Sequence, residues 1–295
     1  MDNNELTLVG VRFFTVSDSN KVVVFPSNGT IVFEKNRDLK FGGVVYAGKF
    51  EYFGSEYYFD YEEFTINLIK VDSARIKVPS FDPEPDGSRP LYYVTNVLEG
   101  IRGAIFIDDP SNKSGLKSED FANYPIFDCV KDSYVYYDHL YNGVYNKEDF
   151  YYQIPPFKID SLETFKTENL SFDGNFISAG IFEDIDEPLI VMRDYSLGFI
   201  RVLPEGGQGI YSDIATFDNQ ITLSGDGLQG NGSLMFFTSI SHSEAFTFFP
   251  DSTLGKTDMF VNEERSQPPE VPEAHAAEVL IGFYPFRTTL LANVF

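Results

Sequence analysis

Glycines at short intervals separate runs of aromatic and β-branched residues in residues 39–68, which read LKFGGVVYAGKFEYFGSEYYFDYEEFTINL. Within each run, apolar side chains tend to alternate with polar ones, and this period of two is typical of strands with one buried face. Because glycine inside such a pattern predicts a turn or a bulge, we expect Gly43, Gly48 and Gly54 to mark corners of a sheet. The stretch therefore predicts a β-rich fold.

Later segments repeat this pattern in altered form. Residues 170–182 read LSFDGNFISAGIF and match 39–50 if one residue is inserted before the Ala-Gly pair, which a β-bulge accommodates. Residues 221–237, ITLSGDGLQGNGSLMFF, again carry glycines at short intervals. Repeated strand–turn units predict an all-β fold: an elongated, antiparallel, meandering sheet, stacked like a solenoid or a groove, with very little helix.

Length and aromatic content allow a large core. The chain has 295 residues with 30 Phe, 18 Tyr and no Trp, and aromatic side chains favour strands and bury large areas. We predict an N-terminal β-repeat region at 1–160, a second at 161–264, a Pro/Glu-rich linker at 265–278 and a terminal strand at 279–295. The polar segment Ser80–Pro90 is predicted to be a loop, because strand-like sequence resumes after it.

The charge balance restricts the partners. With 22 basic and 45 acidic residues the formal charge is −23, which repels a phosphate backbone, so nucleic acid is not an expected partner. The first residues, MDNNELTLVGVRFF, do not combine a basic region with an apolar core, and no run reaches the ~18 apolar residues of a membrane span. We expect a soluble chain with no signal peptide of its own and no transmembrane segment.

Motifs for catalysis are missing. The single cysteine, Cys129, excludes an intramolecular disulfide and is interpreted as a small buried apolar residue. The histidines at 139, 242 and 275 have no neighbours at metal-ligand spacing, and no nucleophile elbow, Walker loop or dinucleotide fingerprint is present. We therefore predict no enzyme activity and no catalytic, cofactor or metal residue.

Two acidic loops and one tyrosine-rich segment leave calcium binding and carbohydrate binding open as alternatives. Residues 108–112 and 183–187 offer the oxygen ligands that calcium prefers, although both also fit a solvated acidic turn, and neither has EF-hand spacing. Residues 124–157 are dense in tyrosine. They predict either cross-strand aromatic pairs on a partly solvated sheet or a surface on which carbohydrate stacks.

The glycine-spaced units at 41–68, 168–182 and 221–252 resemble the repeat modules of very large β-rich cell-envelope proteins of Gram-negative bacteria. The order of features in these units, a strand, then glycines, then an aromatic strand, is also distantly similar to that in AsmA and TamB-like proteins. The resemblance implies long β-grooves associated with carrying lipid across the periplasm, and a place in the periplasm or on the cell surface as part of a larger exported protein. No functional residue carries over.

Three hypotheses follow. The first is a non-enzymatic, β-rich structural or binding module of a larger envelope or surface protein, with other β-modules as partners. The second is a groove that carries lipid or another apolar ligand. The third is a domain that binds or cleaves carbohydrate with tyrosines and a pair of carboxylates.

Overall fold

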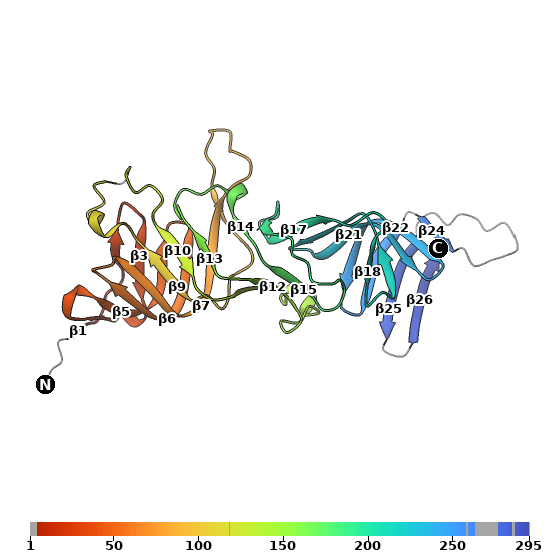
Figure 1. Cartoon of the computed structure of the whole chain (residues 1–295), viewed down its shortest axis with the longest axis horizontal. Coiled ribbons are helices and arrows are strands. Elements are labelled where there is room, and N and C mark those ends of the chain that lie inside the picture. Colours follow the sequence, from red (N-terminus) through yellow and green to blue (C-terminus); the bar gives the residue numbers. More distant parts are fainter. Residues whose placement is uncertain (1–4, 118, 258, 263–276, 285–286, 295) are drawn as a thin grey trace, which may run out of the picture. The chain divides into compact units, whose positions relative to one another are not determined.

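The computed structural model describes residues 5–117, 119–257, 259–262, 277–284 and 287–294, and it confirms the predicted all-β fold (Figure 1). Three antiparallel sheets hold most of the described strands. The helices among the described residues are short 3-10 turns: η1 (Ser27–Gly29), η2 (Lys35–Arg37), η3 (Pro110–Asn112), η4 (Leu140–Asn142) and η5 (Thr167–Asn169). None of the helices in these ranges is long and apolar enough to cross a bilayer.

The chain forms two compact units whose sequences interleave. Unit 1 comprises Met1–Val135 and Gln153–Phe172, and unit 2 comprises Tyr136–Tyr152 and Asp173–Phe295. A small sheet is built from β11 (Ser133–Tyr136), β12 (Phe150–Ile154) and β15 (Asn175–Ser178), in that order. Most of the predicted linker at 265–278 lies outside the described residues.

The large sheet of unit 1 follows the order β1-β4-β5-β6-β7-β9-β10-β13, with β2, β3 and β8 attached beside this path. Its strands are β1 (Leu6–Leu8), β2 (Phe14–Ser17), β3 (Val22–Pro26), β4 (Ile31–Phe33), β5 (Leu39–Ala47), β6 (Phe50–Asp60), β7 (Thr65–Pro79), β8 (Leu91–Tyr93), β9 (Gly103–Phe106), β10 (Ile126–Cys129) and β13 (Phe157–Ile159). The short β14 (Ser171–Phe172) ends the unit. Neighbours in sequence are mostly neighbours in the sheet, so the meander that the glycine pattern predicts is present.

The three glycines singled out in the sequence do mark corners. Gly48, with φ +57°, lies in the tight turn between β5 and β6. The register of β5 against β6 shifts between Phe41 and Gly43, and the register of β6 against β7 shifts on both sides of Gly54. The prediction of turns and bulges at these positions is confirmed.

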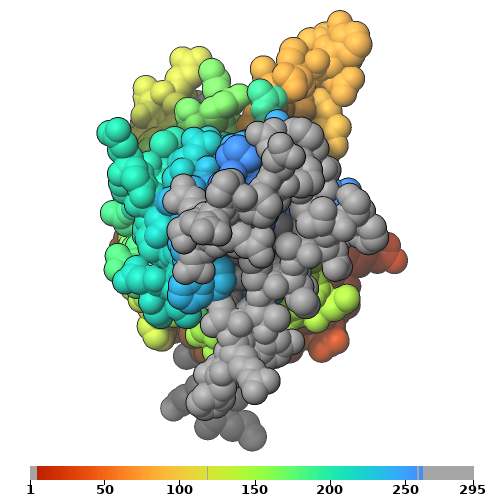
Figure 2. All heavy atoms as spheres, turned by 90° about the vertical axis from the view of Figure 1, so that its right-hand side faces the viewer, coloured from red at the N-terminus to blue at the C-terminus, as the bar shows by residue number. Residues whose placement is uncertain are grey.

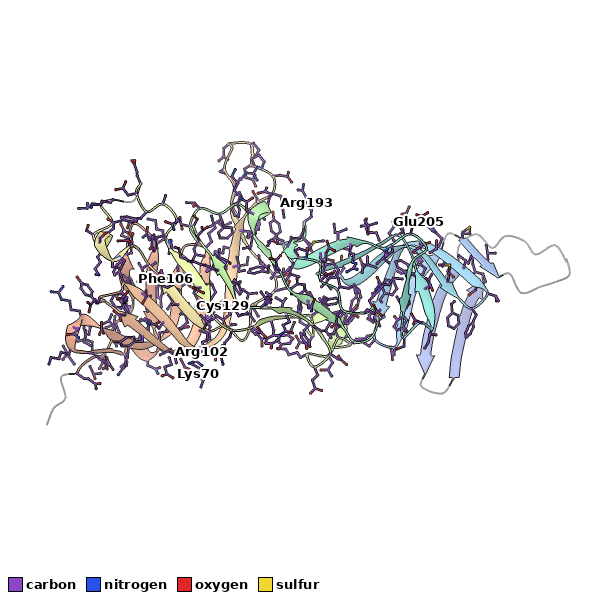
Figure 3. All side chains as sticks on the ribbon, viewed as in Figure 1. Lys70, Arg102, Phe106, Cys129, Arg193 and Glu205 are labelled. Atoms are coloured by element: carbon purple, nitrogen blue, oxygen red, sulfur yellow. The ribbon has the colours of Figure 1, made fainter. Side chains whose placement is uncertain are left out.

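Strand alternation separates an inner from an outer face of this sheet. Val45, Tyr52 and Ala74 lie side by side on β5, β6 and β7, and each is 0% exposed. Cys129, labelled in Figure 3, lies at the end of β10. Its predicted burial is confirmed, and its Sγ donates to the carbonyl oxygen of Lys131 at 3.3 Å. Because the inner face is filled, the residues between these positions must point outward.

The predicted loop at Ser80–Pro90 joins β7 to β8 and projects from the surface (orange in Figure 2). Its ends are tied by a hydrogen bond from the Ser80 amide to the Pro90 carbonyl, 2.9 Å long. The guanidinium of Arg89 donates to the carbonyls of Ser80 and Phe81, both at 2.6 Å. The loop therefore brings β8 back to pair with the end of β7, where Lys77 lies opposite Tyr93.

Unit 2 is built on a second large sheet. Its strands in unit 2 follow the order β16-β17-β20-β21-β22-β23-β25-β26, with β18, β19 and β24 beside this path. The strands are β16 (Leu189–Val191), β17 (Leu197–Val202), β18 (Gln208–Ile210), β19 (Ala215–Phe217), β20 (Gln220–Ser224), β21 (Gly227–Phe236), β22 (Ser239–Phe249), β23 (Ser252–Thr257), β24 (Met259–Asn262), β25 (Ala277–Tyr284) and β26 (Arg287–Val294). Buried phenylalanines such as Phe199, Phe217 and Phe248, each 0% exposed, fill its core.

Candidate functional site

The first acidic loop, residues 108–112, is held by a cluster of buried, hydrogen-bonded polar side chains. Asp108 is only 2% exposed, and its two carboxylate oxygens accept hydrogen bonds from the Asn20 and Asn112 side-chain amides at 2.8–3.2 Å. The backbone amide of Asp109 donates to the same carboxylate at 2.8 Å. Since N–H donors surround both oxygens, this carboxylate holds the loop against the β2–β3 turn and is poorly placed to coordinate a cation.

The second acidic loop, residues 183–187, is tied into unit 2. Ile185 is buried and bridges Phe176, and the Asp186 carboxylate lies 3.3 Å from the Arg201 guanidinium. Within the described ranges, no group of three or more His, Cys, Asp or Glu side chains is placed to hold a metal ion.

The tyrosine-rich segment contributes more to the core than its sequence predicts. Tyr137, Tyr145 and Tyr152 are each 0% exposed, and their hydroxyls donate to backbone carbonyls at 2.8–2.9 Å. Tyr136 and Tyr151 do form a ring pair, with centroids 6.1 Å apart on half-buried side chains, as predicted for a partly solvated sheet. The three buried rings fasten loops to the core of unit 2 and offer no open surface for stacking.

An open aromatic surface lies instead on the outer face of unit 1. Phe13, Phe25, Tyr46 and Tyr93, here called the aromatic strip, come from the segment before β2 and from β3, β5 and β8. The ring centroids of Phe13 and Phe25 are 5.8 Å apart, and those of Phe25 and Tyr46 are 5.3 Å apart. Phe13, Phe25 and Tyr93 are 57%, 44% and 49% exposed, so the rings are available to a ligand.

A lysine links Tyr93 to the other rings of the aromatic strip. The Lys77 ammonium lies 5.7 Å from the ring centroid of Tyr46 and 4.7 Å from that of Tyr93. It also forms a 2.6 Å ion pair with Glu51, which accepts a 2.8 Å hydrogen bond from the Tyr93 hydroxyl. Glu51 is 2% exposed although it belongs to the outer face, because the strip and Lys77 cover it.

This packing shifts the pKa values of Lys77 and Tyr46. Burial alone would lower the pKa of Lys77, but the hydrogen bonds and charges of Glu51 and Tyr93 outweigh it, and the pKa lies above its ordinary value. Burial, with the nearby charge of Glu51, raises the pKa of Tyr46. The strip therefore presents a neutral phenol and a protonated amine beside its rings at neutral pH. Next to it, the Arg75 guanidinium lies 5.2 Å from the ring centroid of Phe53.

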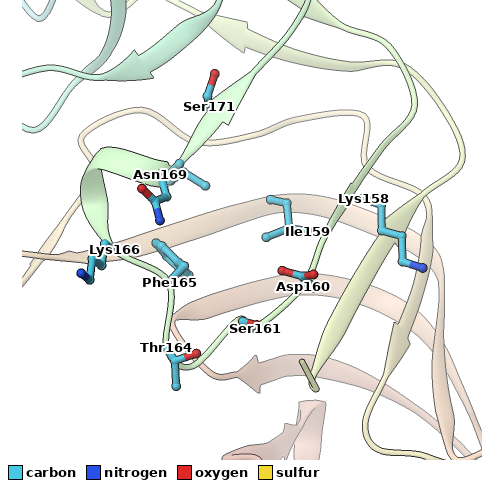
Figure 4. A pocket seen from close by; sticks show the side chains of 10 residues that line it. Lys158, Ile159, Asp160, Ser161, Thr164, Phe165, Lys166, Asn169 and Ser171 are labelled. Atoms are coloured by element: carbon cyan, nitrogen blue, oxygen red, sulfur yellow. The ribbon is translucent and has the colours of Figure 1, made fainter. Parts of the chain in front are cut away.

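A pocket of about 570 Å³ opens elsewhere in unit 1, between the edge strand β13 and the loop that carries η5 (Figure 4). Its lining combines an aromatic ring with polar groups of several kinds: Lys158, Ile159, Asp160, Ser161, Thr164, Phe165, Lys166, Asn169, Leu170 and Ser171. In the close view, Phe165, Ile159 and Asp160 lie near the middle of the pocket, Asn169 lies on its η5 side, and Lys158 and Lys166 lie at opposite ends.

Sequence alternation predicts that individual residues of the aromatic strip face outward, but it does not predict that the four rings lie together. Val22 and Val24 are buried, so alternation alone places Phe25 outward, and the same reasoning applies to Tyr46 between Val45 and Ala47. What brings the four rings together is the pairing of distant strands, which the sequence pattern does not reveal.

No protein-family model matches this chain, and no curated protein or solved structure is significantly similar to it.

Proposed function

We propose that this chain is a non-enzymatic binding module whose aromatic strip binds an extended carbohydrate. The observation that carries the proposal is the row of rings on one outer sheet face, three of them exposed and Tyr46 half-buried, with the Phe13–Phe25 and Phe25–Tyr46 centroids 5.8 and 5.3 Å apart. Exposed apolar surface that is contiguous, and not scattered, marks an interaction site. A strip across several strands favours a linear partner.

Polar groups between the rings favour carbohydrate over an apolar chain. The Lys77 ammonium has one donor left after its bonds to Glu51 and Tyr93, and the Tyr46 hydroxyl is not engaged by another described residue. A sugar chain offers C–H faces to rings and hydroxyls to such donors, whereas a lipid chain offers nothing to the polar groups and leaves them unsatisfied. The buried faces of the two large sheets are filled by side chains such as Tyr52 and Phe217, both 0% exposed.

A glycan array followed by calorimetry on the hits tests the proposal. We expect Phe25→Ala and Tyr46→Ala each to weaken binding about fivefold, since one aromatic contact contributes on the order of 1 kcal/mol. Phe237→Ala is the matched control, because Phe237 is an 80% exposed phenylalanine of unit 2. Unchanged affinity in both strip variants would refute the assignment of the strip. Lipid found by mass spectrometry of the purified protein, with no glycan bound, would favour the apolar-ligand hypothesis instead.

We also propose that the module belongs to a larger exported protein of the cell envelope, where other β-modules are its neighbours. The resemblance of the glycine-spaced segments to envelope repeat modules supports this, and a carbohydrate-rich surface gives a glycan-binding strip its ligand. Cell fractionation with an antibody against unit 1 tests it. Recovery of the full-length product only in the cytosol would contradict it.

A further inference from the structure

The pocket between β13 and η5 is held in shape from several sides. The Lys49 ammonium donates to the carbonyl oxygens of Glu163 and Phe165, at 2.5 and 2.9 Å, and lies 4.6 Å from the Phe165 ring centroid. Burial lowers the pKa of Lys49, with the charge of Glu163 opposing the shift. The Thr167 hydroxyl donates to the Pro79 carbonyl at 2.6 Å, which fixes η5 to the end of β7.

The turn between β5 and β6 supports the same loop. The Lys49 amide donates to the Leu162 carbonyl at 2.9 Å, and a Cβ on Gly48 would lie 2.5 Å from the Leu162 backbone. The loop therefore rests directly on the sheet, with no room to collapse toward it. A pocket whose walls are fixed before binding loses little conformational entropy when a ligand enters.

The lining is suited to a ligand rich in hydroxyl groups. A carboxylate such as that of Asp160 can accept hydrogen bonds from hydroxyls, and an amide such as that of Asn169 can both donate to and accept from them. Neither side chain is bonded to another described residue, and both are exposed. The half-buried Phe165 ring, held by Lys49, supplies an apolar surface for the C–H face of such a ligand.

We propose that this pocket binds one saccharide unit through its hydroxyls, with Asp160 and Asn169 as hydrogen-bonding partners and Phe165 as the stacking surface. The volume of about 570 Å³ lies within the range of small-molecule sites. The inference deepens the proposed function and rests on it for the class of ligand, but it assigns a site other than the aromatic strip. An anion is disfavoured because the Asp160 carboxylate lies in the middle of the pocket, between the two lysines at its ends.

The test is an NMR titration of the full chain with D-glucose, D-galactose, D-mannose, L-fucose, L-rhamnose and N-acetyl-D-glucosamine. Tetrahydropyran, a ring of the same kind without hydroxyls, is the control ligand. We expect at least one sugar to bind and tetrahydropyran to fail. Asp160→Asn and Asn169→Ala should each weaken that binding about tenfold, as expected for hydrogen bonds to a ligand. Glu168→Gln is the matched control, since Glu168 is an exposed acid of η5 outside the pocket lining.

Variants of the two sites separate this inference from the proposed function. Loss of sugar binding in Asp160→Asn with full binding in Phe25→Ala supports the pocket. Binding that depends on Phe25 and is unchanged in Asp160→Asn and Asn169→Ala overturns the pocket and leaves the strip. If none of the six sugars binds while a glycan does bind the strip, the pocket assignment is again wrong. Thermal unfolding of each variant confirms that a lost signal reflects the site and not the fold.

Discussion

The Lys77→Met substitution tests whether the covered ion pair on the outer face of unit 1 is as tightly coupled as its geometry indicates. It removes the ammonium and keeps most of the aliphatic stem. Glu51, 2% exposed, then keeps the 2.8 Å hydrogen bond from Tyr93 but loses its 2.6 Å partner. A carboxylate that is buried without its counter-charge is costly, so we expect a loss of folding stability.

The magnitude follows from the exposure of the two partners. Breaking a fully buried pair costs about 3–5 kcal/mol. Because the Lys77 side chain is 28% exposed, water reaches this pair and screens it, and we expect a smaller loss of about 2 kcal/mol. For a domain of this size that corresponds to a melting temperature lower by roughly 4–8 °C. Urea unfolding followed by circular dichroism measures the free energy of unfolding directly.

The double variant Glu51→Gln/Lys77→Met supplies the decisive comparison. Replacing both partners leaves no buried charge, so the double variant should recover more than half of the lost stability. The pH dependence gives a second check. The folded-state pKa of Lys77 is raised above 10.5, so its contribution is complete below that value and is lost as the pH rises through the higher folded pKa. Equal losses in the single and double variants would refute the reasoning.

Two further predictions concern the backbone turn and the buried tyrosines. Gly48→Ala should lower the free energy of unfolding by about 2 kcal/mol or more, because Gly48 has a positive φ and a Cβ there would meet the Leu162 backbone. Gly87 also has a positive φ but open space around it, so Gly87→Ala should cost only about 1 kcal/mol; chemical denaturation measures both. Tyr211→Phe should cost about 1–3 kcal/mol, because the hydroxyl lies 2.8 Å from two carbonyl oxygens that share its single proton and 2.8 Å from the Thr253 hydroxyl. Tyr52→Phe, whose buried hydroxyl has no partner among the described residues, should be neutral or stabilising by calorimetry. Equal effects within either pair would contradict the structure.

Local patterns predict the strands and corners of this fold well. A glycine predicts a turn or bulge by itself, because it adopts backbone conformations that other residues avoid. The positive φ at Gly48 and the register shifts at Gly43 and Gly54 are such local backbone features. Alternation likewise accounts for the buried apolar side chains of β5 and β6, but not for the burial of Glu51, which the aromatic strip and Lys77 cover. These signals lie within a few residues of one another, so the sequence pattern reveals them without knowledge of the strand pairing.

Long-range pairing is what the sequence does not contain. Tyr93 meets Lys77 only because the Ser80–Pro90 loop returns β8 to β7, and Phe165 meets Lys49 across more than a hundred residues. Composition is also ambiguous for a residue type such as tyrosine, which occurs both in cores and on open surfaces. Tyrosine density around Tyr145 indicated an open face, but its ring is buried and its hydroxyl is bonded to a backbone carbonyl. A tyrosine suits a core as well as a surface whenever a carbonyl lies within reach of its hydroxyl.

The two faces of the unit 1 sheet separate folding from binding. Phe50, on the inner face of β6, is 0% exposed, and its removal should cost about 3–5 kcal/mol of stability. Phe25, 44% exposed on the outer face of β3, has only part of its ring in contact with the protein, and its removal should cost well under half as much. If the aromatic strip serves a ligand, Phe25→Ala loses affinity and keeps the fold. If the strip only covers the sheet, Phe25→Ala loses stability in proportion to its buried area and no glycan distinguishes it from the wild type.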